Sequence, residues 1–221
     1  MIRIFAISFL FTVAISNISF SQTSNYGNWM IYFGNMNLPK KFNWHHEVQY
    51  RNYNIAGDLE QLLLRTGIGY NLSENNNNVL LGYGFIYSEP YLLGGIQKDY
   101  TSEHRIYQQF ITKQNFGRVA IQHRYRIEER FLKDNFKLRF RYFLSCNVAL
   151  NHKSFLKNTL YFAAYNEIFI NGKANYFDRN RLYLGLGFKF SDKIKVEVGS
   201  LNQLVTGGSR NQLNLICFVN L

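Results

Sequence analysis

The chain has 221 residues, a formal net charge of +11 and a 17% share of aromatic side chains, a composition with enough apolar material for one folded domain. Its mean hydropathy of −0.22 excludes a protein built from long apolar membrane helices. A basic balance is also found in nucleic-acid-binding proteins, but the N-terminal segment described next argues against nucleic acid as a partner.

Residues 1–21 differ from the rest of the chain and predict a secretory signal peptide. Arg3 provides a positive start, an almost uninterrupted apolar stretch follows from Ile4 to Ile15, and small residues close the segment. This is the pattern of an exported precursor, and the apolar stretch is shorter than the roughly 20 residues of a membrane-spanning helix. We therefore expect cleavage near Ser21 and one mature domain over residues 22–221.

The mature chain alternates between apolar and polar side chains in runs of about ten residues, which is the signature of β-strands. Clusters of Asn, Gly, Lys and Asp separate the runs, and no helical periodicity of convincing length is present. The predicted strands cover residues 28–37, 42–52, 60–70, 78–87, 102–112, 117–129, 136–150, 159–170, 180–190, 193–203 and 211–221.

The length of these runs favours strands that cross a membrane. In the clearest run, Leu138 and Phe140 occupy one face, while Arg139 and Arg141 occupy the other. Strands of soluble sandwiches average about five or six residues, whereas a membrane-crossing strand needs about 9–11. Because every backbone group in lipid must be paired, such strands have to close into a barrel.

The predicted fold is therefore all-β, a closed antiparallel transmembrane β-barrel with a polar lumen. Eleven runs are visible, but bacterial single-chain barrels have an even number of strands. We expect about twelve strands, with ten as the alternative. A missing strand would lie in residues 22–28 or inside 88–101.

Several short motifs resemble those of a family of exported barrels catalogued as domain of unknown function 2490. The matching pieces are His45-His46-Glu47, Tyr50-Arg51, the tract from Gln61 to Gly67, Gly69-Tyr70, Asn166-Glu167, Gly199 and Asn202-Gln203. The resemblance implies an outer-membrane β-barrel and implies no particular activity.

A ladder of basic side chains falls on the strand faces that the alternation directs into the lumen. Its members are Arg65, Arg124, Arg126, Lys137, Arg139 and Arg141. A hairpin through residues 130–135 would bring Arg124 near Arg141, Arg126 near Arg139 and Glu128 near Lys137. Arginines that oppose each other in this way repel.

Four acidic side chains on inward faces could neutralise this ladder across the lumen: Glu47, Glu103, Glu167 and Glu197. The first interpretation is a buried network of arginines and carboxylates that fills the lumen. The alternative is an open constriction or pocket, because rings of Arg and Lys select anions and fixed arginine forks bind carboxylate or phosphate.

Inward-facing glycines predict a narrow lumen. Glycine in a strand marks close approach by another side chain, and the inward tyrosines Tyr107, Tyr161, Tyr165 and Tyr183 could cover them. The glycines concerned are Gly67, Gly69, Gly82, Gly84, Gly185, Gly187 and Gly199.

Three functions fit this pattern, in order: a structural or envelope-maintenance barrel with a filled, basic lumen, a narrow anion-preferring channel or small-ligand barrel, and a lipid-modifying outer-membrane enzyme. An enzyme would need a histidine base near a serine. The candidates are His45, His46, His104, His123 and His152, with Ser102, Ser145, Ser154 and Ser200, and strand register forces no pair together. No catalytic residue, metal site or cofactor is assigned.

The expected location is the cell outer membrane. The expected partners are the lipid and lipopolysaccharide of that membrane, and the barrel-assembly machinery during insertion.

Overall fold

The computed structural model describes residues 26–73, 76–92 and 97–221, so the predicted signal peptide lies outside the described residues. All eleven predicted runs form strands, and most strands extend beyond the run at one or both ends. The strands are β1 (Tyr26–Asn37), β2 (Phe42–Asn52), β3 (Leu59–Asn71), β4 (Asn77–Ser88), β5 (Thr101–Phe116), β6 (Val119–Leu132), β7 (Asn135–Ala149), β8 (Thr159–Asn171), β9 (Phe177–Lys189), β10 (Ile194–Val205) and β11 (Gly208–Asn220). Within the described residues, no helix is long and apolar enough to span a membrane.

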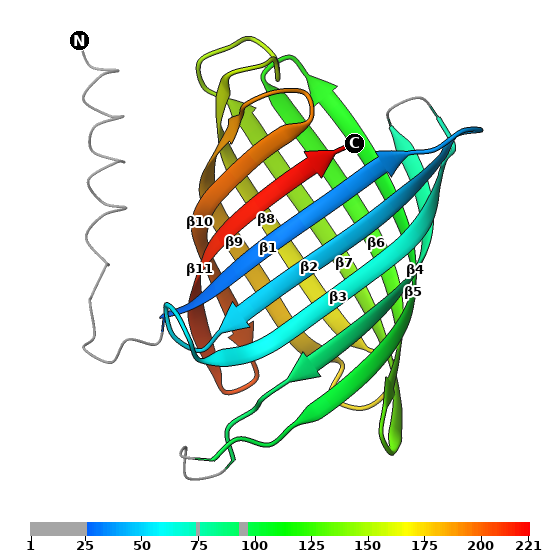
Figure 1. The fold of residues 1–221 in the computed structure, drawn as a ribbon, viewed down its shortest axis with the longest axis vertical. Helices are drawn as coiled ribbons and strands as arrows, with labels where there is room; N and C mark the ends of the chain where they lie inside the picture. Colours follow the sequence, from blue (N-terminus) through cyan, green and yellow to red (C-terminus); the bar gives the residue numbers. More distant parts are fainter. Residues whose placement is uncertain (1–25, 74–75, 93–96) are drawn as a thin grey trace.

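The strands close into one barrel in chain order, with β1 between β2 and β11 (Figure 1). Every sequential pair is antiparallel, but β1 and β11 run parallel, with Trp29 opposite Asn214. The described residues therefore hold eleven strands, whereas we expected about twelve or ten. The even count follows only if the closing pair is also antiparallel, and here a parallel closing pair removes that requirement.

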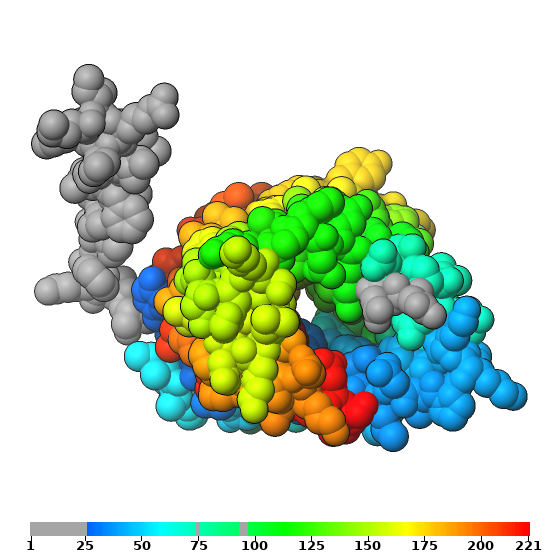
Figure 2. All heavy atoms as spheres, turned by 90° about the horizontal axis from the view of Figure 1, so that it is seen from above, coloured from blue at the N-terminus to red at the C-terminus, as the bar shows by residue number. Residues whose placement is uncertain are grey.

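The odd strand number places the two ends of the domain at opposite ends of the barrel. Here the N-terminal end means the one where β1 begins at Tyr26, and the C-terminal end means the one where β11 finishes at Asn220. The turns at residues 38–41, 117–118 and 190–193 lie at the C-terminal end, which is the end seen in Figure 2. That view shows a hollow between these turns.

Three of the hairpins turn on a single pair of residues, and two of these pairs contain a glycine with positive φ. The β5–β6 turn contains Gly117 with φ +57°, and the β10–β11 turn contains Gly207 with φ +92°. Side chains other than glycine rarely adopt such positive φ values, so these turns depend on glycine. The consequence is a tight hairpin whose register is fixed close to the turn.

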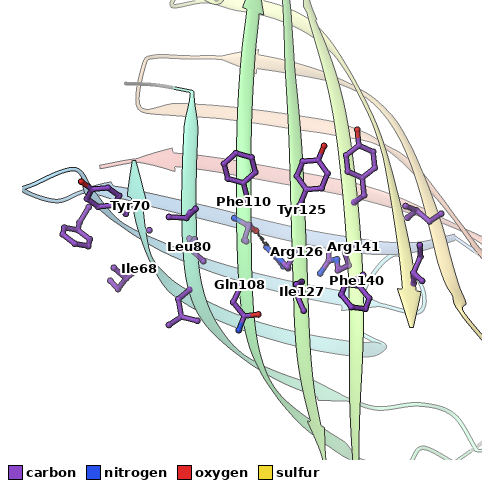
Figure 3. A pocket seen from close by; sticks show the side chains of 18 residues that line it. Ile68, Tyr70, Leu80, Gln108, Phe110, Tyr125, Arg126, Ile127, Phe140 and Arg141 are labelled. Atoms are coloured by element: carbon purple, nitrogen blue, oxygen red, sulfur yellow. Dashed lines mark hydrogen bonds between the residues drawn. The ribbon is translucent and has the colours of Figure 1, made fainter. Parts of the chain in front are cut away.

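Burial follows the strand alternation, with polar side chains inside and apolar side chains outside. On β9, Leu182, Leu184 and Leu186 are exposed, while Arg181 and Tyr183 on the opposite face of the strand are buried. The outer wall also carries an apolar depression of about 710 Å³ over β2 to β8. Figure 3 shows its labelled aromatic and aliphatic side chains, among them Phe110 and Phe140.

The interior on the side of β1 and β11 is packed with apolar and aromatic side chains. The buried cluster consists of Trp29, Ile31, Tyr161, Ala163, Tyr183, Leu201 and Ile216. These residues come from β1, β8, β9, β10 and β11, which are five consecutive strands around the barrel. The cluster therefore packs along the inner face of that part of the wall.

Three of the inward tyrosines lie directly over glycines, as the sequence predicts. A Cβ added at Gly82 would lie 2.2 Å from Cζ of Tyr107, and one added at Gly187 would lie 2.2 Å from Cζ of Tyr161. Tyr183 covers Gly185 in the same way. The remaining predicted tyrosine, Tyr165, instead stacks on Tyr183 with ring centroids 4.7 Å apart.

We predict that Gly187→Ala lowers the free energy of unfolding by about 1–3 kcal/mol, the usual cost of overpacking. Tyr161 cannot move aside freely, because it is fully buried and its hydroxyl donates to Glu197 at 2.8 Å. Urea titration in detergent micelles measures the effect. Gly208→Ala is the matched control, because a Cβ there has no atom within 4 Å. If Tyr161→Leu fails to reduce the cost of Gly187→Ala in a double-mutant cycle, the contact is not its cause.

Candidate functional site: a charged interior and its cavity

The register between β6 and β7 sets the arrangement of the basic ladder. Arg126 lies opposite Arg141, and Glu128 lies opposite Arg139. The expected pairs of Arg124 with Arg141 and of Arg126 with Arg139 were therefore wrong by two residues. Both strands continue further than expected, so the hairpin turns on residues 133–134 alone and its centre moves along the chain.

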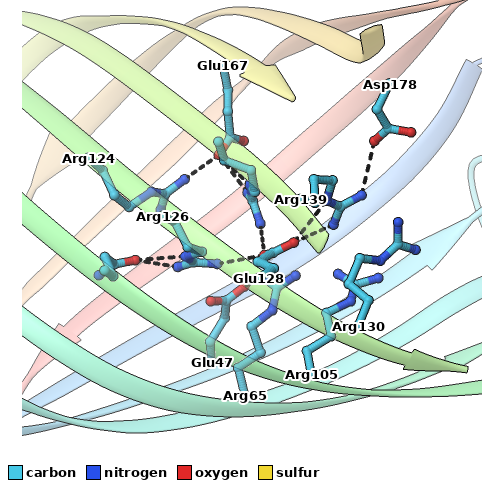
Figure 4. Close-up of polar contacts among 12 residues, drawn as sticks. Glu47, Arg65, Arg105, Arg124, Arg126, Glu128, Arg130, Arg139, Glu167 and Asp178 are labelled. Atoms are coloured by element: carbon cyan, nitrogen blue, oxygen red, sulfur yellow. Dashed lines mark hydrogen bonds and ion pairs between the residues drawn. The ribbon is translucent and has the colours of Figure 1, made fainter. Parts of the chain in front are cut away.

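This shift places Glu128 at the centre of the arginines. Its carboxylate accepts from Arg139 at 2.5 Å and from Arg141, and Arg126 lies 3.5 Å away. Glu128 has no exposed surface, and Figure 4 shows the guanidinium groups converging on it. Carboxylates buried with several hydrogen bonds to arginine form strong charge-assisted contacts. Glu128 thus offsets the repulsion that an all-basic ladder would suffer.

Glu167 forms the second junction of the network, on the adjacent strand β8. Its Oε1 accepts from Arg124 at 2.7 Å and from Arg141 at 2.6 Å, while Arg181 lies 3.9 Å from Oε2. Because Arg141 contacts both Glu128 and Glu167, it joins the two junctions. The guanidinium of Arg141 also lies 4.4 Å from the ring centroid of Phe169, a cation–π contact.

Two of the other predicted acids, Glu47 and Glu103, bind arginines on their own sides of the barrel. Glu47 accepts from Arg65 on β3 at 2.5 Å. Glu103 holds two arginines, with its Oε1 2.6 Å from Nε of both Arg105 and Arg130. Every predicted arginine of the ladder therefore contacts a carboxylate.

Two predicted residues lie apart from this network. Lys137 is exposed near the β6–β7 turn at the N-terminal end and has no ion-pair partner among the described residues. Glu197 accepts from the hydroxyl of Tyr161 at 2.8 Å and lies 3.9 Å from Lys195. The structure thus brings together five of the six predicted cations and three of the four predicted acids, and leaves Lys137 and Glu197 outside.

Sequence reasoning also missed members of the network. The missed residues are Arg105, Arg130, Asp178 and Arg181, together with the buried Arg51. Glu128 was expected on the inward face, but beside Lys137 and not among the acids of the network. Alternation alone could have found Arg105, which shares a strand face with Glu103, and Arg181, which shares one with Tyr183. Asp178 offers no such signal, because it precedes the predicted β9 run and reaches Arg139 at 3.0 Å only through the longer strand.

The barrel interior contains a cavity of about 380 Å³ that begins at the C-terminal end. It extends inward to Arg126, Arg141 and Arg181, and Glu128 and Arg139 do not line it. Eleven of its 34 lining residues are charged: Arg51, Arg65, Lys113, Arg124, Arg126, Arg141, Arg181 and Lys195 face it, with Glu47, Glu167 and Glu197. Eight cationic residues thus stand against three carboxylates.

A second hollow of about 270 Å³ adjoins this cavity at the C-terminal end. The two share Lys113, Gln122 and Lys195 in their linings. Lys189 also lines the outer hollow, but its ammonium binds Asp192 at 2.7 Å. The entrance to the interior is therefore basic as well.

A smaller polar cluster links the β2–β3 and β4–β5 connections at the N-terminal end. Lys98 lies 2.6 Å from Asp58 and 3.2 Å from Glu89, and the Tyr91 hydroxyl donates to Asp58 at 2.9 Å. Partial burial raises the pKa of Asp58, but the hydrogen bonds from Lys98 and Tyr91 outweigh this effect and keep that pKa below its usual value. The cluster joins two connections and does not form part of the cavity lining.

The candidate histidines do not form catalytic pairs in the part of the chain that the structure describes. Three of them hydrogen-bond tyrosines across neighbouring strands: His46 with Tyr32, His104 with Tyr83 and His123 with Tyr142. No group of three or more His, Cys, Asp or Glu in the described ranges is placed to hold a metal ion.

Comparison with known proteins identifies the family. The family model described as "Protein of unknown function (DUF2490)" matches residues 26–214. The chain belongs to this family. An uncharacterized protein of Methylorubrum extorquens is 30% identical over 183 residues, which cover 79% of this chain and 77% of that protein. No solved structure matches the chain.

The DUF2490 match runs from the first residue of β1 into β11 and so contains both junctions of the charged network. The motifs that carry the resemblance contain residues of both faces of the wall. Glu47, Arg65 and Glu167 belong to those motifs, and all three are buried in ion pairs. For this DUF2490 protein, the motifs thus include part of its charged interior.

Proposed function

We propose that the protein is an outer-membrane β-barrel with a structural or envelope-maintenance role, whose interior is closed to ion flow by its arginine–carboxylate network. In this proposal membrane lipid and lipopolysaccharide surround the barrel, and the barrel-assembly machinery inserts it. The observation that carries the location is the inverted distribution of side chains, with leucines exposed and arginines buried on the same strands.

The exposed apolar surface supports a lipid environment. Water-soluble proteins rarely expose apolar patches larger than a few hundred Å², yet here large apolar side chains are exposed on all eleven strands. A closed barrel also pairs the backbone groups of every strand, which a lipid environment demands. Strands of 11–16 residues are long enough to cross the hydrocarbon layer.

The charged network supports a closed interior. Arg126, Glu128 and Arg141 are buried at the inner limit of the cavity, and Arg139 and Glu103 continue the ion pairs toward the N-terminal end. An ion that passed would have to displace these paired groups, and breaking a buried ion pair costs several kcal/mol. Filled interiors are also common in small barrels.

The location is tested by fractionating Gram-negative cells that express the full chain. We expect the protein in the outer-membrane fraction, with a mature N-terminus near Gln22 by mass spectrometry. Recovery of the chain with Met1 intact from the cytosolic fraction would contradict both export and location.

Planar bilayers test the closed interior. The purified, unmodified protein should insert without producing a steady current, while a porin in the same bilayers should conduct. A steady anion-selective current would favour the channel instead. In that case Arg139→Glu together with Arg141→Glu should weaken or reverse the selectivity.

A further inference from the structure

The cavity at the C-terminal end has more cationic groups than its carboxylates can neutralise. Its three glutamates face eight arginines and lysines. Arg51 and Lys113 have no carboxylate oxygen within 4.0 Å among the described residues, and Lys195 has one only at 3.9 Å. By contrast, each of Arg105, Arg130 and Arg139, further toward the N-terminal end, lies within 3.0 Å of a carboxylate. The excess charge is thus concentrated in the cavity.

The unpaired hydrogen-bonding groups of the lining point to the same type of ligand. Among the described residues that line the cavity, three have a buried side-chain polar atom without a partner: Nε1 of Trp29, Nε of Arg65 and Nε of Arg124. All three atoms are N–H donors. Trp29 and Arg65 are 2% and 7% exposed, so bulk water does not satisfy them. Buried donors without acceptors are costly, so the groups around the cavity hold more donors than acceptors, and such a lining favours a ligand rich in acceptors.

Arg51 is held in place without being neutralised. Its guanidinium donates to Oε1 of Gln49 and of Gln61 and lies 3.8 Å from the ring centroid of Trp29. These neutral partners fix the position of the fork and leave its positive charge in the cavity. Fixed guanidinium forks match the geometry of carboxylate and phosphate groups.

We propose that this cavity is a binding site for a small oxyanion that carries phosphate or carboxylate groups and enters from the C-terminal end. Lys113 and Lys195 attract the ligand at the entrance, and Arg51, Arg65 and Arg124 bind it deeper inside. A volume of about 380 Å³ is within the range of small-molecule sites. The cavity belongs to the barrel interior whether or not the barrel crosses a membrane, so the site can be tested separately from the location and the conductance.

Calorimetric titration of the purified full chain in detergent tests the site. Inorganic phosphate, pyrophosphate and citrate are the probes, at constant ionic strength, with chloride as the reference anion, because surface attraction alone depends on salt. A short-chain phosphatidic acid forms a separate arm. We expect saturable binding of at least one free oxyanion with about one site per barrel. Binding of the lipid alone, or of no probe, would overturn the proposal.

Two lysine pairs at opposite ends of the barrel separate a site from general attraction. Lys113→Gln with Lys195→Gln should weaken binding at least about tenfold, since each removes a charged donor. Lys137→Gln with Lys173→Gln, both exposed at the N-terminal end, changes the net charge equally and should leave binding unchanged. Lys113→Gln alone removes no ion pair, and it should weaken binding without changing the urea midpoint. Equal loss in the two double variants would overturn the proposal.

Discussion

Replacing Glu128 with glutamine should lower the free energy of unfolding by about 3–5 kcal/mol, the cost of removing one partner from a buried ion pair. Glutamine keeps the size of the side chain and removes only its charge. Arg139 and Arg141 would then face each other with their main neutralising group gone, inside a barrel that excludes water from Glu128 completely. Urea titration in micelles, followed by tryptophan fluorescence, measures the change.

Glu129→Gln is the matched control for this experiment. Glu129 is the next residue of β6 and faces the other side of the wall, where its carboxylate accepts from the amide of Gln108 at 3.4 Å and has no other side-chain partner among the described residues. Its removal should change stability by less than about 0.5 kcal/mol, as is usual for surface positions. Similar losses in both variants would mean that the interior network does not hold the barrel together. A double variant of Glu128→Gln with Arg139→Gln should be less destabilised than the sum of its single variants.

The strands could be predicted from the sequence because each one has two opposite environments. Leu182 and Leu184 lie on the exposed outer face while Arg181 and Tyr183 lie in the packed interior, so a period of two appears in the residues themselves. The same reasoning correctly expected inward tyrosines to cover inward glycines, since a missing side chain on one strand makes room for a large one nearby. The structure pairs Tyr107 with Gly82 and Tyr161 with Gly187.

Strand register and barrel closure could not be predicted in the same way. Moving the β6–β7 pairing by two residues keeps every side chain on its face, so alternation cannot distinguish Arg124 from Arg126 as the neighbour of Arg141. Only the two-residue turn decides it, and residues 133–134 carry no glycine signal. The parallel contact of β1 with β11 joins the two ends of the chain, which no local pattern describes.

The candidate site was only partly predictable for a related reason. The sequence shows which charged residues face inward, but it does not show which carboxylate each arginine will meet. Glu128 was placed on the inward face next to Lys137, and the true register moved it to Arg139 and Arg141. The excess of hydrogen-bond donors in the cavity depends on which side chains meet across the barrel. For example, Arg51 on β2 and Arg181 on β9 both contact Trp29.

Leu184→Arg should lower the free energy of unfolding in liposomes by about 2–4 kcal/mol, the cost of an arginine near the centre of a bilayer. Leu184 is 50% exposed in the middle of β9, and the outward residues on either side of it are Leu182 and Leu186. If the barrel lies in lipid, the guanidinium would have to leave water. If this face meets water, the same change would cost almost nothing, because surface substitutions usually stay within about 0.5 kcal/mol.

The control uses the same new side chain at a position outside the strands. Tyr176 is 69% exposed in the β8–β9 connection, so Tyr176→Arg should leave stability nearly unchanged in any environment. Urea titrations of both variants in liposomes give the difference, and a second series in which β7 carries Leu144→Arg extends the test to another outward face. The cost of a lipid-facing arginine depends on its depth in the membrane. Arginine at Leu184 or Leu144 should therefore cost more than arginine at an outward position nearer the membrane surface. Equal stability of Leu184→Arg and Tyr176→Arg would remove the physical basis for placing this barrel in a membrane.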